Sequence, residues 1–64
     1  MFTWNVSFLY VEGYGDGTVW EHYYVQAENE VSAIDKALSS FLEEFGLDFD
    51  DDINNIEWDC TRVS

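Results

Sequence analysis

This 64-residue chain carries fourteen acidic side chains against two basic ones, and its formal net charge of −12 disfavours direct binding to nucleic acid or to anionic membranes. Its composition, 47% hydrophobic and 19% aromatic, excludes an acidic disordered segment, which typically lacks aromatic side chains. We therefore expect one small folded domain over 1–64, without room for a separate substrate domain, and a basic macromolecule as its charged partner.

Cys60 is the only cysteine of the sequence, so no disulfide can form within the chain. The first residues, MFTWNVS, lack the basic and apolar regions of a secretion signal. No apolar run approaches the roughly 20 residues that are needed to span a bilayer. Together these features predict a reducing, cytoplasmic location.

The first half of the sequence predicts a β-hairpin. From Phe2 to Val11, apolar or aromatic side chains alternate with polar ones, which is typical of a half-buried strand. The run GYGDG (13–17) predicts a turn, and residues 18–27 resume the β-branched and aromatic pattern of a second strand. This second strand is aromatic on both faces, and one of them is a candidate contact surface.

The second half predicts a helix followed by a strand. Apolar residues recur at three- and four-residue steps over 27–46, which indicates an amphipathic helix with Asn29 as N-cap and Gly46 as left-handed C-cap. After a predicted loop over 47–55, residues 56–63 alternate again. The order β-β-α-β predicts an α+β fold, in which one helix packs on a three-stranded antiparallel or mixed sheet.

No motif specifies a catalytic site or a cofactor, and we expect the protein not to be an enzyme. The glycine-rich run is followed by a strand and has no lysine nearby, unlike a phosphate-binding loop. Cys60 alternates with Trp58 and Ile56 on the expected core face, and we interpret it as an inert thiol. His22 lies among tyrosines and is interpreted as a packing residue.

Calcium binding is an alternative interpretation of the acidic segment. Five side chains match ligand places of an EF-hand loop: Asp48, Asp50, Asp52, Asn54 and Asp59. The sixth place, however, holds Ile53 instead of the required glycine, and a strand follows where an EF-hand has a helix. We expect a solvated acidic segment that binds divalent ions loosely, without a specific metal site.

The acids themselves are the strongest candidate for function. Alternate residues of a strand stand about 6.6 Å apart, which is close to the spacing of phosphates along a nucleic-acid strand. Carboxylates in such rows can enter the Arg/Lys channel of a nucleic-acid-binding protein, whereas the alternative is that the charge only maintains solubility. Eight acids and three aromatic anchors form the predicted partner-binding set: Glu43, Glu44, Asp48, Asp50, Asp51, Asp52, Glu57 and Asp59, with Tyr14, Trp20 and Tyr24.

The acidic stretch EEFGLDFDDD and the aromatic strands WNVSFLY and VWEHYYV occur in a chain without a cysteine framework or catalytic motif. In this combination the whole chain resembles the small acidic inhibitors made by bacteriophages, which include anti-CRISPR proteins and DNA mimics. The resemblance implies an inhibitor that binds a host defence nuclease in the bacterial cytoplasm, often in the groove for guide RNA, target DNA or the protospacer-adjacent motif. The alternative function is a structural or assembly module whose aromatic sheet face binds a larger protein or a second copy.

Overall fold

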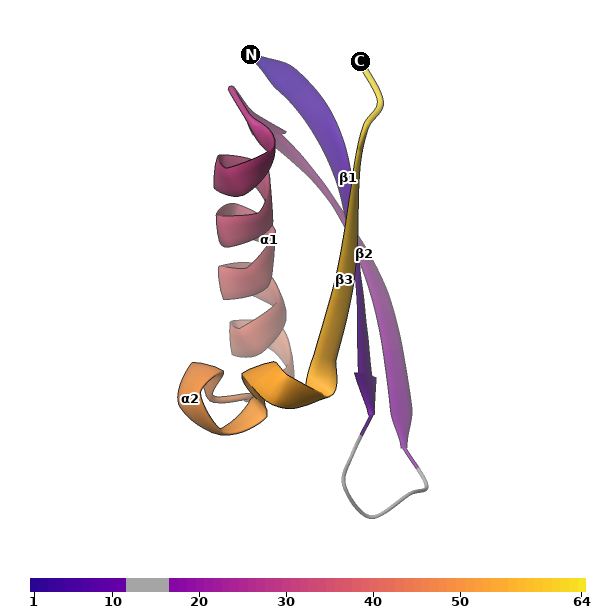
Figure 1. The fold of residues 1–64 in the computed structure, drawn as a ribbon, viewed down its shortest axis with the longest axis vertical. Coiled ribbons are helices and arrows are strands. Elements are labelled where there is room, and N and C mark those ends of the chain that lie inside the picture. The colour runs from indigo at the N-terminus through magenta and orange to yellow at the C-terminus, as the bar shows by residue number, and fades with distance from the viewer. Residues whose placement is uncertain (12–16) are drawn as a thin grey trace.

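The computed structural model describes residues 1–11 and 17–64, and it contains a three-stranded antiparallel sheet with one long helix on one face (Figure 1). The strands are β1 (Phe2–Val11), β2 (Thr18–Ala27) and β3 (Ile56–Arg62), in the order β2-β1-β3. The α+β fold predicted from the sequence is thereby confirmed, and the sheet is antiparallel throughout. The predicted turn at 13–17 lies, apart from Gly17, outside the described residues.

The register of the strands decides which side chains share a face. β1 pairs with β2 over its whole length and with β3 from Trp4 to Tyr10. Residues that are paired directly lie on the same face of a sheet, and alternate residues of one strand share a face. Val6, Phe8 and Tyr10 of β1 are buried, so they define the face beneath the helix.

The long helix, α1 (Glu30–Phe45), begins and ends where the sequence predicts. The side-chain oxygen of Asn29 accepts an N–H bond of 2.9 Å from the first turn. Gly46 adopts φ 65° and ψ 33°, and the N–H of Leu47 donates to the Leu42 carbonyl at 2.8 Å, which completes a Schellman motif. Glycine carries no Cβ that opposes this left-handed conformation. No helix in the described ranges is long and apolar enough to cross a membrane.

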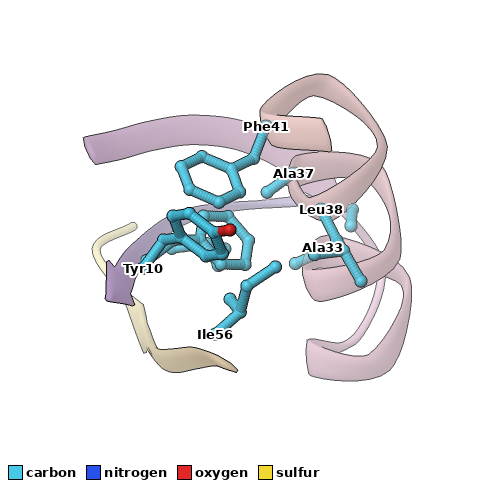
Figure 2. Packing of buried hydrophobic residues seen from close by; sticks show 9 residues of the cluster. Tyr10, Ala33, Ala37, Leu38, Phe41 and Ile56 are labelled. Carbon is cyan, nitrogen blue, oxygen red and sulfur yellow. The ribbon is translucent and has the colours of Figure 1, made fainter. Parts of the chain in front are cut away.

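The hydrophobic core lies between α1 and the inner face of the sheet. Figure 2 shows Phe41 of α1 directed toward Tyr10 and Ile56 of the sheet, with Ala33, Ala37 and Leu38 beside them. The rings of Phe8 and Phe41 stack with centroids 4.9 Å apart, and both side chains are almost fully buried. Large rings bury roughly 150–250 Å² each, which allows so short a chain to build a core without a disulfide.

The segment between α1 and β3 is helical, and the prediction of a loop over 47–55 was wrong. It consists of a short helix, α2 (Phe49–Asp52), and a 3-10 turn, η1 (Ile53–Asn55). The Asp48 carboxylate accepts an N–H bond from α2 at 2.9 Å, and the Asp52 carboxylate accepts the N–H of Asp48 at 2.8 Å. The first N–H groups of a helix have no carbonyl partner within that helix, and the two carboxylates accept N–H bonds at this point instead. The acidic run therefore forms a short helix.

The side chains of β3 lie on the predicted faces of the sheet, but they are less buried than the alternation suggests. Ile56 is 5% exposed, whereas Trp58 is 45% exposed although it pairs with the buried Phe8 on the same face. α1 packs more extensively over β2 than over β3, so the Trp58 ring lies at the margin of the helix layer. Alternation predicts on which face of the sheet a side chain lies, and the position of the helix determines how far that side chain is buried.

Candidate protein-binding surface

The sheet face opposite α1 is covered by no element of the described ranges, and in Figure 1 the helix lies on one side of the sheet only. We call this surface the open face. The register places on it side chains from all three strands: Asn5, Ser7, Leu9, Trp20, His22, Tyr24, Glu57, Asp59 and Thr61. The open face therefore combines two predicted aromatic anchors with two predicted acids.

The aromatic anchors of the open face are well exposed, Trp20 by 63% and Tyr24 by 70%. The indole N–H of Trp20 donates a hydrogen bond of 2.9 Å to Nε2 of His22, two residues along β2. Nε2 accepts this bond only in the neutral imidazole that carries its proton on Nδ1. The bond fixes the exposed indole, which lowers the side-chain entropy that Trp20 loses on binding a partner. His22 is thus a positioning residue for Trp20.

A hollow of about 210 Å³ lies on the open face between β2 and β3. Trp20 borders it on one side, Glu57 and Asp59 border it on the other, and Ser7 and Leu9 of the central strand lie between them. Pockets for small molecules usually measure about 300–1,000 Å³. The hollow is therefore suited to a single long side chain.

Six of the predicted binding acids lie at the end of α1 and in or next to α2, and three of these six form hydrogen bonds within the protein. Glu44 accepts a hydrogen bond from the Tyr23 hydroxyl, which links α1 to β2. Asp52 accepts one from the Tyr10 hydroxyl at 3.1 Å as well as the N–H of Asp48, whose own carboxylate caps α2. Replacing these acids changes the packing as well as the surface charge.

The other three acids of this group, Glu43, Asp50 and Asp51, are exposed, and the described residues give their carboxylates no hydrogen-bond partner. We call them the acidic end. The two basic side chains of the protein contact neutral groups: Nζ of Lys36 donates to a backbone carbonyl of β2 at 2.8 Å, and Arg62 lies 4.6 Å over an aromatic ring of β1. These contacts leave the charge of the acidic end uncompensated.

The structure thus divides the predicted binding residues between two surfaces. The open face holds Trp20, Tyr24 and the strand acids, whereas the acidic end lies in the last turn of α1 and in α2, at the end of α1 that is farther from both termini (Figure 1). Tyr14 lies outside the described residues. Sequence reasoning missed Leu9, which alternation places outward but which only the pairing register places between Trp20 and β3.

The chemistry of the thiol and of the acidic segment is also defined by their surroundings. Cys60 is half-buried, and burial raises the pKa of its thiol, with Glu30 and Asp59 adding to the effect. Reactive cysteines require a lowered pKa. Over 1–11 and 17–64, no three Asp, Glu, His or Cys side chains converge as metal ligands, and the segment with EF-hand spacing is folded into α2 and η1.

The hydroxyl of Tyr23 provides a test of the contact between α1 and β2. Burial raises the pKa of Tyr23 well above its ordinary value of about 10, and the hydrogen bond to Glu44 and the charges of Glu44 and Glu21 raise it further. The folded state keeps this proton at pH values where the unfolded chain has lost it. The contribution of the protonated Tyr23 hydroxyl to the free energy of unfolding is therefore fully present below about pH 10 and is lost as the pH rises further.

We expect Tyr23→Phe to lower the free energy of unfolding by about 1 kcal/mol at neutral pH. The same variant is expected to lose less stability than the wild type above about pH 10, because it has no phenol at this site to titrate. Urea unfolding measured from neutral to alkaline pH checks both effects. Tyr24→Phe, on the open face, is the matched control and should follow the wild type; parallel curves for Tyr23→Phe and wild type would contradict the assignment.

The chain matches no family model, no curated protein and no solved structure. Its class therefore rests on the fold and the surface described above. Over residues 1–11 and 17–64, the protein has an α+β fold with one sheet face that no described element covers and a cluster of acids without a described ion-pair partner.

Proposed function

We propose that this protein is a non-enzymatic inhibitor that binds a nucleic-acid-binding host protein through its acidic surface. The observation that carries the proposal is the placement of exposed acids at the acidic end and on β3, while both basic side chains contact neutral groups elsewhere. The partner class that complements this surface is one that presents Arg and Lys to a phosphate backbone. The proposed target is a CRISPR-Cas effector or another defence nuclease, and the proposed site of action is the bacterial cytoplasm.

A folded scaffold gives these acids an advantage over a flexible acidic tail. Glu57 and Asp59 are alternate residues of β3, so their side chains repeat at about 6.6 Å on one face of a hydrogen-bonded strand. Because their backbone is already ordered, little conformational entropy is lost when they pair with a basic groove. Pairing also releases the counterions of both surfaces, as nucleic acid does when it enters such a groove.

The exposure of the aromatic anchors favours a second candidate function. Trp20 and Tyr24, 63% and 70% exposed, are the kind of large side chain that carries most of the energy of a protein interface. In this candidate the protein is a structural or assembly module, and the open face packs against a larger protein. Such an interface is nearly independent of salt, whereas one built on acids against arginines weakens as salt screens the charges.

Affinity capture separates the two candidates. The protein is immobilised, a lysate of a bacterial host that contains its defence nucleases is passed over it, and bound proteins are eluted with a salt gradient and identified. The inhibitor predicts a nuclease or other nucleic-acid-binding protein that elutes as salt rises and is displaced by added DNA or RNA. A partner indifferent to salt and nucleic acid, or the absence of any nucleic-acid-binding protein, contradicts the inhibitor.

A further inference from the structure

We propose that the hollow on the open face binds one arginine side chain of the partner, with its guanidinium between the Trp20 indole and the carboxylates of Glu57 and Asp59. This inference rests on the proposed function and names the chemical group that this surface recognises. The size of the hollow, about 210 Å³, is consistent with one side chain. The arrangement of charge and ring around it selects arginine.

The pairing register sets the width of this site. Leu9 is paired with Trp20 on one side and with Glu57 on the other, so the three residues form one row across the sheet. Neighbouring strands lie about 4.8 Å apart, so the backbones of Trp20 and Glu57 are separated by roughly two strand spacings. A side chain that lies over Leu9 therefore has the ring on one side and the carboxylate on the other.

Two of the side chains that border the hollow, Trp20 and Asp59, are held by hydrogen bonds before a ligand arrives. The indole N–H of Trp20 is bonded to His22 at 2.9 Å, and one carboxylate oxygen of Asp59 accepts the N–H of Cys60 at 3.0 Å. The other oxygen of Asp59 receives no bond from the described residues. Asp59 lies one row from Glu57, about 6.6 Å along β3, and supplies a second carboxylate on the same side of the hollow.

Arginine satisfies this combination better than the alternatives. Its planar guanidinium stacks on aromatic rings and donates paired hydrogen bonds to carboxylates, whereas the lysine ammonium is a compact and strongly hydrated point charge. An apolar side chain would remove water from Glu57 and Asp59 without replacing the lost hydrogen bonds. Among the open-face residues named above there is no lysine or arginine, so the cation must come from the partner.

Charge also disfavours a second copy of this chain as the occupant. A symmetric dimer brings the same patch of both subunits together. Such a dimer would place Glu57 and Asp59 of both copies, four carboxylates, in one interface without a lysine or arginine of the open face to pair with them, and like charges in an interface oppose association. The open face is therefore suited to a basic partner.

Titration with two short peptides tests the arginine site. The probes are a capped peptide of alternating arginine and glycine and its lysine counterpart, added to the ¹⁵N-labelled protein. We expect the arginine peptide to bind about tenfold more tightly than the lysine peptide and to shift the indole N–H signal of Trp20 and the backbone amides of Leu9 and Glu57. Equal affinity of the two peptides would overturn the proposal.

Two double variants with the same change in charge locate the effect. Glu57→Gln with Asp59→Asn is expected to weaken binding of the arginine peptide about tenfold, because both carboxylates of the hollow are lost. Asn at 59 keeps an oxygen for the Cys60 N–H, so the strand should remain folded, which thermal unfolding verifies. Asp50→Asn with Asp51→Asn removes two charges outside the hollow and should change the affinity less than about twofold.

Equal weakening by both double variants would show general attraction between charges and would overturn the arginine site, while leaving the inhibitor in place. Conversely, selective binding of the arginine peptide together with a lysate capture that yields no nucleic-acid-binding protein would support the site and contradict the inhibitor. The two proposals therefore fail through different measurements.

Discussion

Replacement of Phe41 by alanine is expected to lower the free energy of unfolding by about 3–5 kcal/mol. Phe41 is 0% exposed, stacks on Phe8 at 4.9 Å and meets Tyr23 edge-on with centroids 6.3 Å apart. Phe-to-Ala changes in a core cost about 3–5 kcal/mol. At about 0.05–0.15 kcal/mol per residue, a domain of this length has a total stability of only about 3–10 kcal/mol, so this one ring supports a large share of it.

Urea unfolding followed by circular dichroism measures this effect. Val31→Ala on the same helix is the control, because Val31 is 78% exposed and its truncation should change stability by less than about 0.5 kcal/mol. If Phe41→Ala and Val31→Ala unfolded at the same urea concentration, α1 would not pack on the sheet as described. The face opposite α1 could then no longer be assigned as the open face.

Local signals predicted the main elements of this fold because each has a local cause. Alternation separates the two faces of each strand without reference to any other segment, and the Asn29 and Gly46 caps act within one helical turn. The order of the elements predicts the direction of β3 but not the strand with which it pairs, so an antiparallel and a mixed sheet both remained open. α1 runs back along the sheet against the direction of β2, so β3 runs parallel to β2 and antiparallel to β1, which lies between them (Figure 1).

The features that the sequence did not predict depend on distant contacts. α2 is too short to show a helical period, and its Asp52 is held by the hydroxyl of Tyr10, 42 residues earlier in the chain. Trp58 lies on the predicted face but remains half-exposed, because its depth depends on where α1 packs. Likewise, the hollow at Leu9 exists only because the pairing on both sides of β1 aligns it with Trp20 and Glu57.

The internal bonds of Asp52 also change the choice of residues for a test of the acidic surface. Asparagine at position 52 would have one side-chain oxygen for two donors, the Tyr10 hydroxyl and the Asp48 N–H, so a loss of binding in that variant would also reflect a weakened α2. Glu43, Asp50 and Asp51 carry the same charge without such bonds in the described chain. They form the cleaner set for measuring what the acidic end contributes.

We expect Glu43→Gln, Asp50→Asn and Asp51→Asn, combined, to weaken binding to the captured partner by about 10- to 100-fold. Three exposed ion pairs of up to about 1 kcal/mol each give this range. The dependence of the dissociation constant on salt should also become shallower, because fewer counterions are released. Isothermal titration at several salt concentrations measures both quantities, and an unchanged melting temperature shows that the fold is intact.

The matched control is Glu28→Gln, Glu30→Gln and Asp35→Asn, which removes three charges around the start of α1, far along the helix from the acidic end (Figure 1). If the negative charge serves solubility alone, both triple variants should bind as the wild type does but precipitate more readily, because net charge sets solubility. If only the sum of charge attracts the partner, both should weaken binding equally. Weaker binding in the first variant alone shows that the position of the acids matters as well as their number. Phosphate mimicry requires this dependence on position.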